Sequence, residues 1–343
     1  FAQAIRALAN VRGGREAVAN VRDLVAPLGC QDGLADLERT LEQLDEKGLA
    51  DRIFVDFSVM SSFDYYTGIV FVAFAPALGA PLGSGGRYDN TIGAYGESRP
   101  AAGFAFFLER AMAAAAAADE RAASGDGQRP LRIAVPKGSL FKDTLRVLEA
   151  VGLPTEELAD PGRKLIITVG DVEYVIVRAQ DAPAFVGHGG ADCGICGKDS
   201  LIEAGLDLLQ LVDLCYGGCR FVVAEPAANT GQAERNYRWR GTVRVATKYP
   251  RITQQYYDRI GQQVDILTLH GNIELGPIVG MTDRIVDITA TGTTLRENDL
   301  VIVDDVMECT ARFFAGPAAY RCDKRIRDLA ARLAEVSATT KEA

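Results

Sequence analysis

From residue 131 onwards, short apolar runs alternate with amphipathic segments that repeat at helical spacing. The runs predict strands at 131–136, 164–170, 173–179, 191–197, 219–225, 242–249, 264–271, 284–290 and 300–307. The amphipathic segments predict helices at 141–152, 181–189, 198–205, 252–261 and 322–336. Such alternation is typical of an α/β protein, and we expect its sheets to be mostly parallel.

The N-terminal third follows a different pattern. Leucines at 34, 37, 41 and 44 predict a helix that Asp32 could cap and Gly48 could end. Strand-like runs at 52–60 and 67–75 lead into a glycine-rich turn at 82–90, and a last helix is expected to begin near Gly103. The order helix, strands, helix indicates an α+β domain with antiparallel pairing.

A boundary between the two patterns is visible at 111–130. An alanine run that can continue a helix is followed there by Ser-Gly-Asp-Gly-Gln-Arg-Pro, which is typical of a flexible linker. We therefore expect one domain at 1–115, a linker at 116–130 and a second domain at 131–343.

Composition narrows the class of protein. The 343 residues carry 37 basic and 46 acidic side chains, a net charge of −9, which argues against a nucleic-acid binder. No apolar run reaches the roughly 18 residues that a bilayer-spanning helix needs, so we expect no membrane partner. The chain starts at Phe1, and it has seven cysteines, an odd number unlike a disulfide framework. We expect a cytoplasmic protein.

The segment 284–300 carries the strongest chemical signal. An apolar strand ends near Asp287, and Thr291, Gly292, Thr293 and Thr294 follow as a hydroxyl-rich turn before a short helical pattern. Backbone N–H groups and hydroxyls in such a turn can bind phosphate, and Asp287 could bind ribose hydroxyls or hydrated Mg²⁺. The alternative is a polar turn whose threonines only cap a helix. The turn is not a Walker loop, because GxxxxGK[ST] is absent.

The pattern D-x-x-x-T-G-x-T-L-R-x-N at 287–298 resembles the phosphoribosyl-pyrophosphate loop of ATP phosphoribosyltransferases. Segments similar to that family follow in family order from about residue 131 to the end, among them IAVPKGSL, VATKYP and LHGNIELGPIVG. The resemblance implies a bilobal fold like type II periplasmic binding proteins, with one lobe at about 131–218 plus 301–343 and the other at 219–300. It also implies transfer of phosphoribosyl from phosphoribosyl pyrophosphate to N1 of ATP, with Mg²⁺ as cofactor.

The resemblance assigns roles to individual residues. Catalytic roles fall on Arg163, Arg178 and Asp287, and Asp287 is also the metal ligand. Substrate-binding roles fall on Lys137, Gly138, Ser139, Glu274, Ala290, Thr291, Gly292, Thr293, Thr294 and Leu295. Two positions depart from the family pattern, because Ser139 replaces an arginine and Ala290 replaces a glutamate of many relatives.

Cysteines and histidines give no second site. Cys193 and Cys196 form a CxxC that could suggest a redox pair or half a zinc site, but they lie in an apolar strand where cysteine packs as a small hydrophobe. Cys215 and Cys219 have a wider spacing, and we interpret all four as structural thiols. His188 and His270 are isolated in the sequence, so we assign neither of them to a catalytic dyad.

The N-terminal third has a resemblance of its own. DYYTGIVF, LGSGGRYDN and AAGFAFFLER are similar to the C-terminal half of a histidyl-tRNA-synthetase-like core, and more closely to the regulatory paralogue of short-form ATP phosphoribosyltransferases. The residues that match its histidine pocket are Asp64, Tyr65, Tyr66, Gly85, Gly86, Arg87, Tyr88, Asp89 and Arg110. Ser61, Ser62 and Phe63 replace the Arg-Gly-Leu of synthetases. We expect a vestigial regulatory pocket without aminoacylation.

The main hypothesis is an enzyme fused to part of its own regulatory subunit. Three alternatives stay open: a histidine-sensing module without catalysis, a bilobal solute-binding protein and an inactive fragment. The loop at 287–295 together with Lys137 counts against the first, and the phosphate-type loop and the absence of a visible signal sequence count against the second. The expected partners are ATP and phosphoribosyl pyrophosphate as substrates, further copies in a homo-oligomer, and a synthetase-like regulatory subunit.

Overall fold

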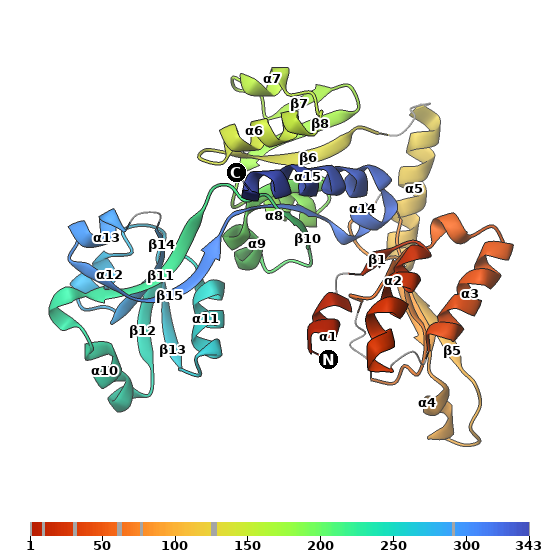
Figure 1. Ribbon diagram of the computed structural model, residues 1–343, viewed down its shortest axis with the longest axis horizontal. Coiled ribbons are helices and arrows are strands. Elements are labelled where there is room, and N and C mark those ends of the chain that lie inside the picture. The colour runs from red at the N-terminus through yellow and green to blue at the C-terminus, as the bar shows by residue number, and fades with distance from the viewer. Residues whose placement is uncertain are drawn as a thin grey trace. The chain divides into compact units, whose positions relative to one another are not determined.

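The computed structural model describes residues 2–8, 11–29, 33–59, 64–75, 78–124, 129–289 and 292–342. The chain divides at residue 119 into two compact units, each described here by itself (Figure 1). None of the helices in these ranges is both long and apolar enough to cross a membrane.

The first unit combines a helical layer with two small antiparallel sheets. Its apolar core joins two helices to a short strand through Ala17, Val18, Val21, Leu34, Leu41 and Val55. Its elements are α1 (Ala2–Leu8), β1 (Arg12–Gly13), α2 (Glu16–Val25), η1 (Ala26–Leu28), α3 (Leu34–Glu46), η2 (Ala50–Arg52), β2 (Val55–Asp56), β3 (Val70–Ala73), β4 (Gly83–Arg87), α4 (Asp89–Gly93), β5 (Ala102–Phe106) and α5 (Leu108–Ser124).

Some predictions for this unit are confirmed and two are wrong. The first of these is the glycine-rich turn at 82–90, whose residues 83–87 form strand β4 between β3 and β5. The leucine spacing does mark a helix, α3, which ends before Gly48, whereas the proposed cap Asp32 lies outside the described residues. The helix expected from Gly103 begins only at Leu108. Residues 102–106 instead pair with β4 as strand β5, because the backbone of β4 offers them a full antiparallel ladder.

The glycines of β4 allow the three-stranded sheet to close tightly. A Cβ atom at Gly85 would lie 2.2 Å from the carbonyl oxygen of Gly103 on the neighbouring strand, a distance that real Cβ atoms do not reach. Gly85 therefore serves the close approach of β4 and β5, in line with its place in a glycine-rich hairpin.

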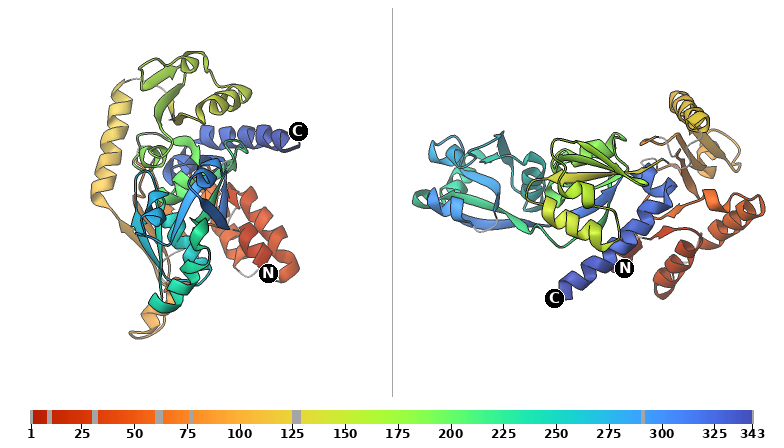
Figure 2. Two further views of the ribbon diagram at one scale, coloured as in Figure 1. Left: turned by 90° about the vertical axis from the view of Figure 1, so that its left-hand side faces the viewer. Right: turned by 90° about the horizontal axis from the view of Figure 1, so that it is seen from above.

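The second unit contains two mixed sheets with helices packed on them (Figures 1 and 2). The first sheet has the strand order β10-β16-β9-β6-β8-β7 and comprises β6 (Leu131–Lys137), β7 (Ile166–Val169), β8 (Val172–Arg178), β9 (Cys193–Gly197), β10 (Leu209–Asp213) and β16 (Ala311–Ala315). The second has the order β13-β12-β14-β11-β15 and comprises β11 (Cys219–Pro226), β12 (Val243–Thr247), β13 (Val264–Thr268), β14 (Arg284–Thr289) and β15 (Leu300–Cys309).

The helices of this unit lie mostly between the strands in sequence. They are α6 (Phe141–Ala150), α7 (Glu156–Ala159), α8 (Ala182–Gly187), α9 (Lys198–Ala204), η3 (Ala227–Asn229), α10 (Gln232–Arg240), α11 (Pro250–Arg259), α12 (Leu275–Ile278), α13 (Thr293–Glu297), α14 (Pro317–Cys322) and α15 (Lys324–Glu342). The last helix returns its apolar side chains Ile326, Leu329 and Leu333 to the core of the first sheet.

The chain crosses between the two sheets twice. It enters the second sheet at Cys219, the first residue of β11, and leaves at Cys309, the last residue of β15. We expected the return near residue 301, but β15 pairs with β11 along its length and the chain turns back at Thr310. Two α/β lobes joined by two crossing segments form the bilobal architecture of type II periplasmic binding proteins, as expected.

The expectation of mostly parallel sheets is wrong. Parallel pairing is confined to β9, β6 and β8 in the first sheet and to β13, β12 and β14 in the second. The other described pairs are antiparallel, because β7 forms a hairpin with β8, and because β11, β15 and β16 belong to the segments that cross between the lobes. One strand carries the chain into the second lobe and another carries it back, so the two run in opposite directions. When such strands lie next to each other they pair antiparallel.

Candidate functional site

Basic side chains gather at one edge of the first sheet. Lys137 and Arg178 are the last residues of the adjacent parallel strands β6 and β8, and they are direct register partners. The β7–β8 ladder continues to Leu165, whose carbonyl oxygen accepts a hydrogen bond from the Ile176 N–H at 2.8 Å, so Arg163 comes to the same edge. All three basic side chains are exposed, as are Gly138 and Ser139. Such an edge is suited to bind anions.

The loop after β14 lies on the second sheet. Ala290 and Thr291 are outside the described residues. Gly292 has φ +72°, a left-handed conformation that favours glycine, and its N–H donates to Thr289 Oγ1 at 2.8 Å. Thr293 and Thr294 are exposed at the start of α13. Leu295 packs in the core, so its side chain is not available to a ligand.

Asp287 lies near the end of β14 in a half-buried position. Burial raises the pKa of its carboxyl, as does the neighbouring carboxylate of Glu274, whereas the Ile288 N–H and the ammonium of Lys248 lower it. The Ile288 N–H donates to Asp287 Oδ1 at 2.8 Å. The pKa is raised overall because the ionised carboxylate is poorly stabilised in this position. A cation or a hydroxyl donor that binds to it would therefore stabilise the charge.

A cavity of about 220 Å³ opens where the two lobes of the second unit meet. The first lobe contributes Gln180 and part of α9, and the second contributes the residues just after β12. The lining residues are Gln180, Asp199, Ser200, Glu203, Ala204, Lys248 and Tyr249. None of them was predicted as a site residue. Part of the sequence signal was present, since Lys248 and Tyr249 belong to the segment VATKYP that resembles the family, but nothing in their spacing shows that they meet residues of α9.

Lys248 is the main addition that the structure makes to the predicted site. Its ammonium lowers the pKa of Asp199 from the first lobe and of Asp287 from the second, so its charge acts on carboxylates of both lobes. Burial nevertheless dominates at Asp199 and raises the pKa of that carboxyl. The turn that carries Lys248 is fixed by Thr247, whose Oγ1 donates to Val286 O at 2.7 Å and accepts from Tyr249 N–H at 2.9 Å.

Glu203 connects the lobes beside the cavity. Its carboxylate, on α9, accepts hydrogen bonds from the backbone N–H groups of Ile252 at 2.8 Å and Arg251 at 3.3 Å, in the first turn of α11. Burial is the main cause that raises the pKa of Glu203. A carboxylate at a helix N-terminus is stabilising, so this contact holds the two walls of the cavity together.

The structure thus forms two groups from the predicted residues. Lys137 and Arg178 share an edge of the first sheet, and Arg163 lies in the turn that precedes β7. On the second sheet the charge of Glu274 acts on Asp287. The cavity is lined by Gln180, two residues after Arg178, and by Lys248, whose charge lowers the pKa of Asp287.

A metal cage made by the protein alone is not found among the described residues, where no three His, Cys, Asp or Glu side chains converge. Mg²⁺ is usually held by one or two carboxylates together with substrate phosphates and water. Asp287 and Glu274 fit that donor set.

Cys193 and Cys196 pack as apolar side chains, which confirms the prediction for these two residues. They lie on opposite faces of β9, in different core clusters, and so do not face one another as a redox pair or half a zinc site. Burial raises the pKa of both thiols. His188 bonds Ala184 O of its own helix at 2.9 Å through Nδ1, and His270 is exposed.

Tyrosines cluster in the first unit where the resemblance places a histidine pocket. The rings of Tyr65 and Tyr66 are 4.5 Å apart between centroids, and Tyr88 meets Tyr65 edge-on at 5.6 Å. Arg87 Nε donates to Asp89 Oδ2 at 2.7 Å, so both charges are already paired.

Other predicted members of this pocket have structural roles. Gly85 and Gly86 are buried in β4, and a Cβ at Gly86 would lie 2.7 Å from the ring of Tyr66. Arg110 donates to Pro81 O at 2.8 Å and lies over the Phe107 ring. Asp64 is exposed, and residues 61–63 lie outside the described ranges.

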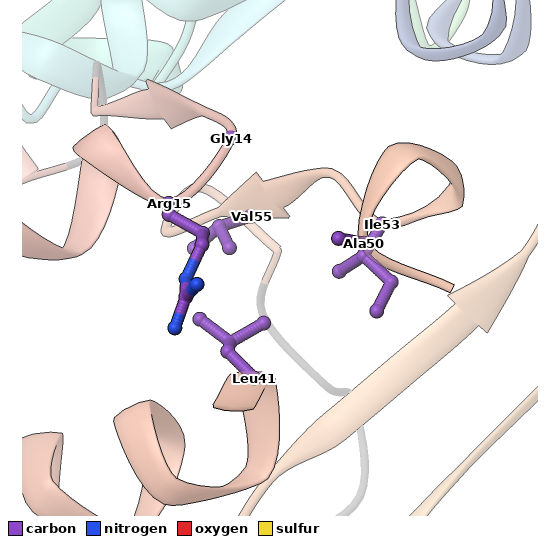
Figure 3. Close-up of a pocket in the computed structure, with 6 residues that line it drawn as sticks. All are labelled: Gly14, Arg15, Leu41, Ala50, Ile53 and Val55. Carbon is purple, nitrogen blue, oxygen red and sulfur yellow. The ribbon is translucent and has the colours of Figure 1, made fainter. Parts of the chain in front are cut away.

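A pocket found in the first unit lies elsewhere, between α2, α3 and the β2 segment (Figure 3). It is lined by Gly14, Arg15, Leu41, Ala50, Ile53 and Val55 and holds about 10 Å³. That is room for about one water molecule, so it cannot accept an amino acid.

Basic side chains on one sheet edge, a carboxylate and hydroxyl loop on the other sheet, and a cavity lined by both lobes define a two-lobed α/β protein for phosphate-bearing substrates. A family model described as ATP phosphoribosyltransferase matches residues 178–335, and one described as histidyl-tRNA synthetase matches residues 1–111. The protein belongs to the ATP phosphoribosyltransferase family.

Individual relatives support this assignment. The ATP phosphoribosyltransferase of Rubrobacter xylanophilus is 50% identical over 193 residues, which are 56% of this chain and 89% of that protein. That of Moorella thermoacetica is 47% identical over 199 residues, 57% of this chain and 87% of that protein. A solved ATP phosphoribosyl transferase (HisG:HisZ) complex from Thermotoga maritima matches with a TM-score of 0.51 and 33% identity, over 61% of this chain and 99% of that one.

Proposed function

We propose that the protein transfers the phosphoribosyl group of phosphoribosyl pyrophosphate to N1 of ATP and releases pyrophosphate, as the first step of histidine biosynthesis. The observation that best supports the proposal is the pairing of Lys137 with Arg178 at one lobe, with Asp287 and the threonine loop on the other lobe of the same unit. Family membership supplies the substrate class.

In this reaction the N1 lone pair of ATP attacks C1 of the ribose, the bond from C1 to pyrophosphate breaks, and pyrophosphate leaves with the electron pair. Both substrates are polyanions, so positioning and charge neutralisation dominate the catalysis. Lys137, Arg163 and Arg178 bind phosphate oxygens. The N–H groups and hydroxyls of Thr293 and Thr294 bind the 5-phosphate, and Asp287 accepts hydrogen bonds from the ribose hydroxyls.

Asp287 and Glu274 would hold Mg²⁺ together with substrate phosphate oxygens, and Mg²⁺ would supply further neutralisation of the leaving pyrophosphate. Lys248 offsets the negative charges of Asp287 and Asp199 that would repel the substrates, because its ammonium acts on both carboxylates. The cavity between them takes part of one substrate.

We further propose that the first unit is a regulatory portion, since it matches the histidyl-tRNA synthetase model and keeps the tyrosine cluster. A synthetase-like subunit or further copies of this chain would be its partners. We place the protein in the cytoplasm, in keeping with the free cysteines among the described residues.

The proposal is tested by the absorbance of phosphoribosyl-ATP formed from ATP, phosphoribosyl pyrophosphate and Mg²⁺. Thr294→Val removes an exposed hydroxyl of the loop and should lower kcat/KM by roughly 5- to 150-fold, the equivalent of about 1–3 kcal/mol. The control is Thr168→Val, which removes an exposed hydroxyl at the far end of the β7–β8 hairpin and should change nothing. Equal activity of both variants would remove the loop from the phosphate site.

A further inference from the structure

Two cysteines that are far apart in sequence face each other in the second sheet. Cys219 and Cys309 are direct register partners on the antiparallel strands β11 and β15. Both are free cysteines, and each thiol is the largest influence on the pKa of the other. Directly opposed residues of antiparallel strands have Cα atoms about 4.5–5.5 Å apart, which lies inside the range of about 4.4–6.8 Å that disulfides span.

This cysteine pair sits where both crossing segments leave the second sheet. Cys219 begins β11 and Cys309 ends β15. On the side of the first lobe, Thr310 Oγ1 donates to Asp213 Oδ1 at 2.7 Å, and the Ala311 N–H donates to Tyr216 O at 2.9 Å. The two segments are therefore held together by hydrogen bonds that can open and close, and a covalent bond at the cysteines would make that junction permanent.

The two thiols differ in their access to solvent. Cys309 is buried, with 2% of its surface exposed, and packs in the core of the second lobe, whereas Cys219 is partly exposed. The neighbouring Cys309 thiol is the main cause that lowers the pKa of Cys219, which favours the nucleophilic thiolate at the accessible sulfur. An attacking thiol is thus in reach of solvent, with a resolving thiol directly behind it.

We propose that Cys219 and Cys309 form a reversible dithiol–disulfide site that hydroperoxides oxidise. The Cys219 thiolate attacks one peroxide oxygen, the O–O bond breaks, and a sulfenic acid forms as hydroxide leaves and takes up a proton. The Cys309 thiol then attacks that sulfur, its proton passes to the departing hydroxyl, and water leaves. Two thiols have lost two electrons, and one hydrogen peroxide has become two water molecules. A dithiol reductant reverses the reaction by thiol–disulfide exchange.

The site lies next to the cavity. Phe221, two residues after Cys219, meets Tyr249 of the cavity wall edge-on, with 4.7 Å between the ring centroids. Asp199 of the opposite wall acts electrostatically on both thiols. A disulfide would fix the strands about which the lobes rotate when a ligand enters, and lobe rotation about a few residues is how two-lobed proteins close. We therefore expect the disulfide to slow turnover, an effect that rests on the proposed function.

The chemistry is tested on the full chain without substrates. The protein is treated with hydrogen peroxide at equal concentration, quenched with catalase, alkylated with N-ethylmaleimide and digested without reductant. We expect a linked peptide that joins Cys219 to Cys309, and two fewer alkylated thiols, both recovered with dithiothreitol. Cys219 oxidised to sulfinic acid while Cys309 stays alkylatable, or a Cys219 disulfide to Cys215, would overturn the site.

Variants separate this pair from the other thiols. Cys219→Ser and Cys309→Ala should resist cross-linking, and Cys215→Ser, the matched control four residues away, should behave as the original chain does. If Cys309→Ala does not fold, Cys219→Ser decides alone, since that position is partly exposed. Loss of most phosphoribosyl transfer in the oxidised protein, with recovery on reduction, is expected, and full activity of the cross-linked protein would overturn the switch. A chain with no transferase activity that still cross-links contradicts the proposed function and leaves the site intact.

Discussion

Lys137 and Arg178 end two neighbouring parallel strands at the same level, so two cationic side chains leave the sheet side by side. Like charges at this spacing repel one another, and within the described residues neither side chain forms an ion pair with a carboxylate. An edge of this kind is stabilised when an anion binds, because a phosphate neutralises both charges at once.

The first prediction follows from this pair. Lys137→Met and Arg178→Met should each lower kcat/KM roughly 10- to 150-fold, because each loses about 1.5–3 kcal/mol of charged hydrogen bonding to substrate. The double variant should lose less than the sum, since both side chains contact one anion group. Initial rates at varied phosphoribosyl pyrophosphate measure both effects.

The control uses the other end of the same strands. Arg132 of β6 pairs with Glu173 of β8, with 2.7 Å between Nε and Oε1. Arg132→Met removes a charge from the same strand, away from the edge that ends at Lys137, and should leave kcat/KM unchanged. Similar losses in Arg132→Met and Lys137→Met would mean that the effect is structural or one of overall charge.

Sequence patterns alone were sufficient to predict the two strands that carry Lys137 and Arg178. The apolar runs at 131–136 and 173–179 are strands because they are buried on both faces, a pattern that a single chain displays without its partners. The order of strands was not accessible in this way. Nothing local shows that β7 turns back along β8 as a hairpin or that β15 pairs with β11, since register is set by contacts distant in sequence.

The same limit applies to the site. Asp287 and the threonine loop were found because their chemistry lies within twelve consecutive residues. Lys248 was missed because its significance comes from Asp199 and Asp287, which reach it from two different lobes. The Cys219–Cys309 pair was missed for the same reason, because the two cysteines meet only through the pairing of β11 with β15. In the sequence, Cys219 was compared with the nearby Cys215 instead.

A second prediction concerns the buried ion pair at the other end of β14. Arg284, 8% exposed, donates from Nε to Glu225 Oε2 at 2.9 Å, and it also binds Glu234. Arg284→Met leaves the carboxylate of Glu225 buried without its partner and should lower the free energy of unfolding by about 3–5 kcal/mol. Urea denaturation measures the change.

The matched control is an exposed pair of the same type in the same sheet. Arg220 and Asp305 lie 3.0 Å apart on β11 and β15, with much of both side chains in solvent. Arg220→Met should lower the free energy of unfolding by less than about 1 kcal/mol. If Arg284→Met lowers the free energy of unfolding no more than Arg220→Met does, the buried pair contributes little to stability. The expected penalty for leaving Glu225 buried without its partner would then be wrong.

A third prediction concerns acid stability. Although burial alone would raise the pKa of Asp283, hydrogen bonds from Arg240, the Arg244 N–H and Asn236 outweigh it, and the pKa is lowered. A folded-state pKa below the unfolded value means that the carboxylate stabilises the fold above the unfolded pKa of about 3.9. This stabilisation is lost as the pH falls through the lowered pKa.

Asp283→Asn should therefore be less stable than the original chain at pH 7, and the difference should shrink as the pH falls below about 4. Urea denaturation at a series of pH values from neutral to acid gives the two curves. Asp265→Asn, at an exposed position on neighbouring β13, should follow the original chain throughout. A gap between Asp283→Asn and the original chain that is constant with pH would show that the carboxylate's charge is not the cause.

The last prediction concerns histidine. A feedback ligand shifts a conformational equilibrium only by its difference in affinity for the two states, so regulation requires real binding to the first unit. In that unit Tyr65, Tyr66 and Tyr88 pack against one another, Arg87 is paired with Asp89, and Arg110 is turned to Pro81. The groups that would hold an amino acid are thus already engaged, and each missing hydrogen bond to a charged ligand costs about 1.5–3 kcal/mol.

We therefore expect calorimetry on the 343-residue chain to show no saturable histidine binding below about 1 mM, and histidine at that concentration to leave the initial rate unchanged. A chain in which the first half of a synthetase-like core precedes residue 1 should bind histidine and be inhibited by it, because that half would supply further ligand contacts. Tyr66→Ala should abolish binding in the longer chain and change nothing in the 343-residue one. Tight binding by the 343-residue chain that Tyr66→Ala removes would show that the tyrosine cluster suffices on its own, and the prediction would be wrong.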